Sequence, residues 1–330
     1  MLQFDHPPEE CSLGQPEPFS ETVGNADTPP TGFIKRFWAW ITLLFMGIAW
    51  GYTVILAKVI TAGGGHPFGI AMWMSVLGAG FLLVFSTIRR RPISLRRDVL
   101  WLYVACGLLG VVVPAVSFYF AAPHLPAGVL SITVTVGPIL TFLFSVFFGL
   151  ERFASLRVLG VVFGILAVAL LVVPETSLPD RSAVPWVLLA CVPGLCYALE
   201  NMILTFRLPD GVSSFTIACG NFLVSSVVLV GVVVATDTFV PLAWPWGVVE
   251  WSIVGMAAIN AVCFGLVIYL ITYAGVVFST QVAYLITISG VAWGIVIFDE
   301  QHSVWVWLSL ACILTGLTLI RPRKHKQTTE

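Results

Sequence analysis

Residues 127–148 read AGVLSITVTVGPILTFLFSVFF and contain no charged side chain. A helix needs about 20 predominantly apolar residues to cross the hydrocarbon core of a bilayer. This run therefore has the length and composition of a membrane-spanning helix. Similar runs lie on both sides of it along the chain.

The composition of the whole chain favours lipid as its main solvent. Apolar residues make up 58% of the 330 residues and charged residues 10%, whereas a soluble domain contains about 25% charged residues. The mean hydropathy is +0.97. We therefore predict an all-α membrane protein with ten transmembrane helices. The expected spans are Trp38–Ile60, Phe68–Ile88, Val99–Ala122, Ala127–Phe148, Leu156–Val173, Val184–Phe206, Phe215–Ala235, Trp251–Tyr273, Phe278–Phe298 and Val304–Ile320.

The ends of the chain differ from the apolar runs. The first 33 residues are rich in acids and prolines and contain no Lys or Arg, which is typical of a disordered segment. We expect a cytoplasmic tail at residues 1–36 and a short basic tail at residues 322–330. Between them we expect two five-helix units, residues 37–175 and 176–321.

The positions of Lys and Arg predict how the chain threads the membrane. With ten spans, both termini lie on one side. If that side is the cytoplasm, every Lys and Arg except Lys58 and Arg181 falls in a cytoplasmic segment, as the positive-inside rule requires. We expect a protein of the cytoplasmic membrane, of bacterial inner-membrane type, with Lys58 extending toward the outer surface.

No cofactor is expected from the motifs. Six of the seven cysteines lie inside predicted spans, where thiols act as small apolar fillers. The chain shows no metal-binding spacing and no phosphate-binding glycine loop. The expected partners are a small-molecule solute and the bilayer, without nucleic acid. We expect a monomer or a weak homodimer.

The two halves of the chain resemble each other. Glu151 and Glu300, each following an aromatic-rich span, are 149 residues apart, and Tyr119 and Tyr269 are 150 apart. Five spans per repeat is an odd number, so the second repeat enters the membrane inverted. Inverted repeats place a substrate site near the midplane, at the interface between the repeats.

Several motifs resemble the EamA-type transporters of the drug/metabolite transporter superfamily. Trp50-Gly51 is similar to a Trp-Gly pair in the first helix of that family. The Gly137-Pro138 helix that leads to Glu151-Arg152 is similar to its fourth helix. Two departures are the Leu150 that separates Gly149 from the acid, and Thr287, where a proline parallel to Pro138 is expected. The resemblance implies two inverted five-helix repeats around a central cavity that opens alternately to each side. It also implies transport, since members of the family export amino acids, metabolites or toxic compounds, or take up nutrients.

Glu200 is the acid that stands out within a span. It lies seven residues before Arg207, about 10 Å of helical rise from the cytoplasmic end. A carboxylate at that depth is costly unless it faces a cavity or a partner, and desolvation favours its neutral form. We expect Glu200 to contact the solute and to exchange a proton. The alternative is a structural ion pair or hydrogen bonds to a neighbouring helix.

Other polar and aromatic side chains within the spans are candidates for solute contacts. Polar groups also join helices, hydroxyls also bond their own backbone, and aromatic rings also pack inside bundles, so a structural role is open for each. With Glu200, the candidate substrate-binding residues are Trp50, Tyr52, Ser131, Thr135, Tyr197, Asn201, Asn260, Tyr269, Gln281 and Trp293. Ser131 and Thr135, four residues apart, are expected to share one helix face.

Three prolines lie inside predicted spans: Pro114, Pro138 and Pro193. Each removes one backbone hydrogen bond and favours a kink. The kinks are expected either as hinges for gating or as fixed curvature around a cavity. His124 and His302 lie in predicted outer loops, where we expect exposed side chains without a role.

The function predicted from these features is secondary transport of a small neutral, zwitterionic or cationic metabolite, with export and proton coupling as the expected mode. Apart from Lys58, and Arg157 at the cytoplasmic end of its span, no Lys or Arg lies within a span, whereas carriers of phosphorylated cargo need cations to neutralise it. A membrane-embedded sensor or assembly subunit is the alternative. A membrane enzyme is less favoured, because no clustered catalytic motif is present.

Overall fold

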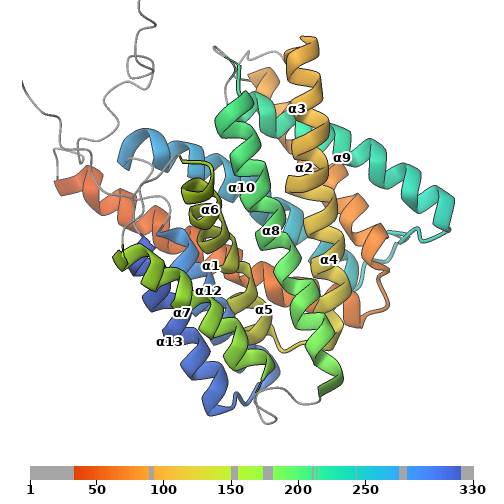
Figure 1. Cartoon of the computed structure of the whole chain (residues 1–330). Coiled ribbons are helices and arrows are strands. Elements are labelled where there is room, and N and C mark those ends of the chain that lie inside the picture. The colour runs from red at the N-terminus through yellow and green to blue at the C-terminus, as the bar shows by residue number, and fades with distance from the viewer. Residues whose placement is uncertain are drawn as a thin grey trace, which may run out of the picture.

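The computed structural model describes residues 33–88, 93–149, 155–173, 181–209, 212, 214–242, 244–274 and 281–320. The segment before Phe33, the tail at residues 322–330, and Glu151 with Arg152 lie outside the described residues. Within them all regular structure is helical (Figure 1). The elements are α1 (Phe33–Ala62), α2 (Pro67–Ile88), α3 (Arg97–Gly107), the π-helix η1 (Leu108–Val112), α4 (Val113–Ala121), the 3-10 turn η2 (Ala122–His124), α5 (Ala127–Val134), α6 (Val136–Phe147), α7 (Ser155–Val172), the 3-10 turn η3 (Arg181–Ala183), α8 (Val184–Arg207), α9 (Ser214–Thr236), α10 (Val248–Ala274), α12 (Val282–Phe298) and α13 (Val304–Ile320).

The helical segments coincide with the apolar runs of the sequence. Six stretches of the described chain are long and apolar enough to cross a membrane: Phe37–Ala62, Pro67–Ile88, Arg97–His124, Ala127–Phe147, Arg181–Arg207 and Phe215–Thr236. The other four predicted spans overlap with four shorter apolar helices: Val158–Val172, Val248–Cys263, Val282–Phe298 and Val304–Leu319. The predicted all-helical architecture is confirmed, while the number of ten crossings stays a prediction.

The outer surface of the helices is apolar. Phe147 is 80% exposed, Val234 77% and Val227 74%. Large apolar side chains exposed along several helices would be unfavourable in water, because apolar area is driven out of contact with it. In a bilayer the same side chains contact acyl chains. The surface therefore agrees with a protein whose helices lie in lipid.

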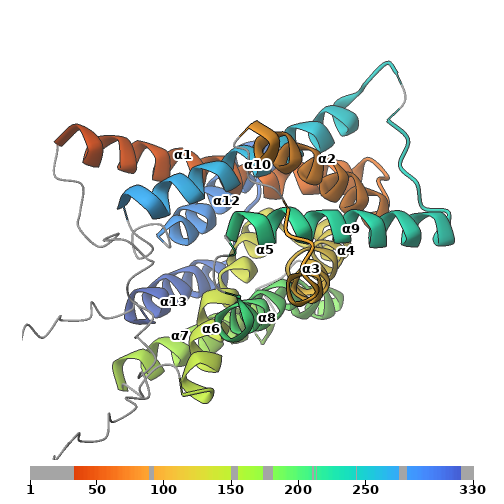
Figure 2. The ribbon, with the colours of Figure 1, turned by 90° about the horizontal axis from the view of Figure 1, so that it is seen from above.

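The packing of the helices repeats between the two halves of the chain. Helix α1 of the first half packs against α10 and α12 of the second half. Helix α8 of the second half packs against α4 and α6 of the first half. These are equivalent contacts if α8 corresponds to α1. Elements at corresponding positions also pair with each other, as α2 does with α9 and α7 with α13 (Figure 1 and Figure 2). Most of the close packing is therefore between the halves rather than within one half.

Two of the three prolines mark interruptions of a helix. Pro114 has no N–H to donate to the carbonyl of Gly110, and the chain just before it widens into the π-helix η1, where the N–H of Val113 bonds the carbonyl of Leu108. Pro138 follows the break at Thr135 that separates α5 from α6. Pro193 lies within α8, which continues past it. Whether these sites act as hinges stays a prediction.

Close approach of α8 to α6 depends on two glycines. A Cβ added to Gly194 would lie 2.9 Å from the backbone nitrogen of Gly137 and 3.3 Å from its Cα. A backbone cannot turn aside as a flexible side chain can. Small residues allow this distance between helices in lipid, where van der Waals packing drives association.

We predict that Gly194→Ala lowers the stability of the folded protein, because the added methyl group forces α8 away from α6. Overpacking of this kind costs about 1–3 kcal/mol. The measurement is the midpoint of thermal unfolding in detergent. The matched control is Gly80→Ala in α2, where an added Cβ meets no atom within 4 Å; its midpoint should stay the same or rise. Equal midpoints for both variants would contradict the close packing of α8 on α6.

Candidate functional site

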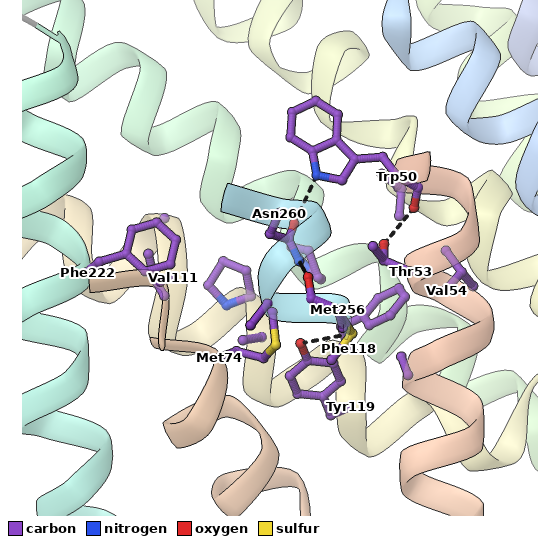
Figure 3. Close-up of a pocket in the computed structure, with 18 of the residues that line it drawn as sticks. Trp50, Thr53, Val54, Met74, Val111, Phe118, Tyr119, Phe222, Met256 and Asn260 are labelled. Atoms are coloured by element: carbon purple, nitrogen blue, oxygen red, sulfur yellow. Dashed lines mark hydrogen bonds between the residues drawn. The ribbon is translucent and has the colours of Figure 1, made fainter. Parts of the chain in front are cut away.

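A cavity of about 350 Å³ lies between the two halves of the bundle. Its lining comes from both halves: Trp50 and Thr53 of α1, Tyr119 of α4, and Met256 and Asn260 of α10 among them (Figure 3). Most of the other lining side chains are apolar. The cavity has the size expected for a small-molecule site, about 300 Å³ or more.

The polar groups of this cavity are held in place by hydrogen bonds. The indole Nε1–H of Trp50 donates to Oδ1 of Asn260 over 2.9 Å, and Nδ2 of Asn260 donates to the carbonyl oxygen of Met256 over 2.9 Å (Figure 3). The Tyr119 hydroxyl lies 3.9 Å from the sulfur of Met256. The bond between Trp50 and Asn260 ties α1 to α10 at the cavity wall.

A second cavity of about 390 Å³ adjoins the first. Gly110, Val111, Tyr197 and Phe222 line both. The second cavity continues past Glu200 toward the residues where α8 ends and α9 begins, since its lining also includes Leu204, Leu208, Ile217, Ala218 and Asn221. Together the two cavities form a path from the middle of the bundle to that end.

Glu200 is the only acidic side chain among the residues that line these two cavities in the described chain, and no Lys, Arg or His lines them. Its Oε1 accepts a hydrogen bond of 3.3 Å from Nδ2 of Asn221, a residue of α9. Its carboxylate lies against Gly110 of η1, where an added Cβ would overlap with it. π-Helical turns occur often at functional sites, and this one leaves room for the carboxylate.

Four of the predicted solute contacts line the cavities: Trp50, Tyr197 and Asn260 line the first, and Glu200 with Tyr197 lines the second. The other predicted residues whose side chains the structure describes do not line either cavity. Asn201 is exposed and donates to Thr141, while Gln281 precedes the first turn of α12. The side chain of Tyr269 lies outside the described residues. Contact with a solute stays a prediction for all of them.

Ser131 and Thr135 have structural hydrogen bonds. Ser131 donates to the carbonyl of Ala127 over 2.8 Å and Thr135 to that of Ile132 over 2.6 Å, and both side chains are buried. The break between α5 and α6 falls at Thr135.

Tyr52 and Trp293 pack on each other instead of lining the cavities. Their ring centroids lie 5.2 Å apart in an edge arrangement, and the Trp293 indole N–H donates to the carbonyl of Ile48. Tyr52 also packs against the buried core.

The opposite end of the cavity is closed by packed apolar side chains, which we call the closing cluster: Leu56, Ile60, Ile70, Ile253 and Met256. Ile60, Ile70 and Ile253 have no exposed surface. They come from the end of α1 and the beginnings of α2 and α10. The closing cluster thus lies at the end where α1 meets α2, while the second cavity extends toward the end of α8.

An ionic cluster lies at the same closed end. Nζ of Lys58 lies 3.0 Å from Oε1 of Glu300, which also accepts the backbone N–H of Ala127 over 2.6 Å. Oε2 of Glu300 accepts the N–H of Gly128 over 3.1 Å. Glu300 thus caps the N-terminus of α5, where a carboxylate is favoured, and connects it to α1. Lys58, which was predicted to extend toward the outer surface, forms an ion pair with Glu300.

The environment of Glu300 favours its charged form. Burial alone would raise the pKa of its carboxyl group. The N–H groups of Ala127 and Gly128 and the ammonium of Lys58 outweigh burial and hold the pKa below its ordinary value of 4.5. The carboxyl is therefore ionised at neutral pH.

His302 differs from the expectation of an exposed loop residue, because its side chain is only 2% exposed. Its Nε2 lies 3.5 Å from Oε2 of Glu300. Burial lowers the pKa of His302; Lys58 lowers it further, and Glu300 opposes both. The prediction failed because the loop after α12 folds back onto the start of α5.

Comparison with known proteins gives the family. A model of the EamA-like transporter family matches the chain twice, over residues 37–173 and over residues 184–321. The chain belongs to the EamA-like transporter family. As an EamA-like protein with several apolar helices, it is a multi-pass membrane transporter of the drug/metabolite type.

Two further comparisons bear on this EamA-like protein. No match is found among curated proteins. A solved crystal structure, described only as that of a protein, superposes with a TM-score of 0.56 at 18% sequence identity, covering 86% of this chain and 97% of the other. At that identity the likeness shows the fold alone.

Sequence reasoning missed several residues of the EamA-like site. Gly110, Phe118 and Phe222 line the cavity but have no unusual charge or spacing. Pro114 has no N–H to donate to the carbonyl of Gly110. In the sequence, this proline alone indicated an irregular turn at Gly110. The partnership of Lys58 with Glu300 joins residues 242 positions apart, which no local pattern indicates.

We predict that Glu300→Gln destabilises the protein at neutral pH by about 1–3 kcal/mol, because it removes the charge that caps α5 and pairs with Lys58. A carboxyl whose pKa is lower in the folded state stabilises it above the ordinary pKa, and this contribution is lost as pH falls below about 4.5. Unfolding midpoints of the two proteins in detergent should therefore converge below that pH.

The control for Glu300→Gln is Asp98→Asn, which breaks an exposed ion pair with Arg96. Exposed pairs contribute about 0–1 kcal/mol, so this variant should unfold close to the wild-type midpoint. A wild-type midpoint for Glu300→Gln at neutral pH would show that the ionic cluster does not hold the closed end together.

Proposed function

We propose that this protein is a secondary active transporter that carries a small neutral, zwitterionic or cationic metabolite or drug by alternating access. The observation that carries the proposal is the path formed by the two adjoining cavities, which begins between the halves of the bundle and is closed at one end by the closing cluster. A path closed at one end is what a carrier requires, because a path open at both ends would leak.

The proposed membrane is the cytoplasmic membrane, with both termini in the cytoplasm. The placement of Lys and Arg supports this orientation. Arg207 ends α8 just beyond Leu204 of the second cavity, so in the proposed orientation this cavity extends toward the cytoplasm. A solute entering from the cytoplasm would reach Glu200 before the first cavity. We propose export as the direction of transport.

Glu200 is proposed as the coupling residue. It is the single titratable carboxylate on the path through the described chain, and its partner Asn221 is neutral. A carboxylate without a permanent cationic partner can take up and release a proton without the breaking of an ion pair. A proton moving inward through Glu200 would then drive the solute outward.

We propose that the alternate conformation opens the closed end by separating α1 and α10 around Asn260. The bond between Trp50 and Asn260 joins these two helices at the cavity wall, and the ionic cluster holds α1 to α5 nearer the closed end. Opening must separate the closing cluster, and the corresponding helices of the other half, α8 and α4, would close around Glu200.

The test is solute flux into proteoliposomes under an imposed pH gradient. We predict that Glu200→Gln reduces gradient-driven flux at least about tenfold while the folded protein stays in the membrane, because the amide cannot exchange a proton. Glu250→Gln is the matched control: Glu250 lies at the start of α10, outside the two cavities, and bonds the backbone of Gly247. Its flux should equal that of the wild type.

Two outcomes would contradict the proposal in different ways. Normal gradient-driven flux in Glu200→Gln would remove Glu200 from the coupling. An intact wild-type protein that binds solutes but gives no flux under any gradient would instead favour a membrane-embedded sensor.

A further inference from the structure

The second cavity presents more hydrogen-bond acceptors than matched donors. Oδ1 of Asn221 is buried and has no hydrogen-bond partner among the described residues; the whole residue is 6% exposed. Its Nδ2 donates to Glu200, which fixes the orientation of the amide, because the reverse orientation would place two acceptors against each other. A buried acceptor left without a donor is unfavourable.

The Glu200 carboxylate adds to this excess. An ionised carboxylate accepts hydrogen bonds through both oxygens and donates none. Asn221 supplies one donor to Oε1, and no cation lines either cavity in the part of the chain that the structure describes. Both Asn221 and Glu200 line the same cavity, so the missing group is one that brings positive charge and several N–H donors.

The space next to this pair is apolar. Tyr197 and Phe222 line both cavities, so a molecule whose charged end lies at Glu200 can extend between them into the first cavity. There it meets Phe118, Met74 and Val54 (Figure 3). The two cavities thus suit a charged head and an apolar body, in that order from the open end.

We propose that the solute of this transporter is a primary amine with an apolar or aromatic body, bound as its ammonium ion by Glu200 and Asn221. The three N–H donors of a primary ammonium match the oxygens of the two side chains, which a quaternary ammonium could not satisfy. Amino acids are excluded as good ligands, because their carboxylate would meet no cation in either cavity. This assignment rests on the proposed function and narrows its substrate class.

Gly110 is the positioning residue of this site. A Cβ there would overlap with the carboxylate of Glu200. Because the carboxylate is the end of a flexible side chain, it would turn aside without unfolding η1. Gly110→Ala should therefore move the anionic group away from Asn221 and weaken ammonium binding, while the cavity keeps its apolar walls.

The experiment measures binding to the purified full-length protein in detergent, by calorimetry and by thermal shift at neutral pH. The probes are 2-phenylethylamine, phenylalanine and 2-phenylethanol, which share the aromatic body. Phenylalanine adds a carboxylate to the amine, and the alcohol removes its charge. We expect the amine to bind at least about tenfold more tightly than either of the others. In Glu200→Gln the amine should bind no better than the alcohol.

A matched pair of variants keeps the test decisive if Glu200→Gln does not fold. Gly110→Ala should weaken binding of the amine about tenfold and leave the weak binding of 2-phenylethanol unchanged. Gly255→Ala, in α10, adds the same methyl group where no atom lies within 4 Å, and it should bind the amine as the wild type does.

Several results would overturn the assignment. Phenylalanine binding as tightly as the amine would show that a carboxylate is accommodated. Sodium chloride raising the unfolding midpoint as much as the amine chloride would indicate an alkali-cation site. Flux of neutral or zwitterionic solutes with no preference for the amine would leave transport standing and refute the amine site. Selective amine binding without flux would support the amine site and refute transport.

Discussion

Contact between the backbones of helices from opposite halves is the constraint on which this architecture depends. Helices in lipid gain nothing from hiding apolar surface, so they associate through close van der Waals packing. Gly194 against Gly137 provides such an approach between α8 and α6. Gly51, where a Cβ would overlap with Ser289, provides it between α1 and α12. The central cavity lies between the halves and is lined in part by α1, α8 and α12 themselves.

The same solvent restricts where polar side chains can lie. Most hydroxyl groups in the spans bond the carbonyl of a preceding turn, as Ser117, Ser131 and Thr287 do, which satisfies them without a neighbouring helix. Asn260 and Glu200 are different, because each accepts a hydrogen bond from a side chain of another helix. The chemical character of the path is therefore set by a few groups in an otherwise apolar surrounding.

The sequence predicted the helices well because lipid requires long apolar runs, and such runs can be seen without a structure. Glu200 could be singled out for the same reason, since a carboxylate inside an apolar run is costly. Ser131 and Thr135 do not line either cavity, and their hydroxyls bond carbonyls of their own helix segment, which their spacing in the sequence could not indicate. The burial of His302 depends on how a loop returns to α5, and no spacing in the sequence records that.

The π-helix η1 also lets one segment pack against two neighbours. An α-helix turns by about 100° per residue, and a π turn holds one more residue than an α turn, so the chain after η1 presents a different face. α3 packs against α9, and α4 packs against α8. With one residue fewer at this turn, the faces of α3 and α4 would be rotated relative to each other by about 100°. Its length is thus fixed by geometry even at positions where the identity of the side chain is free to vary.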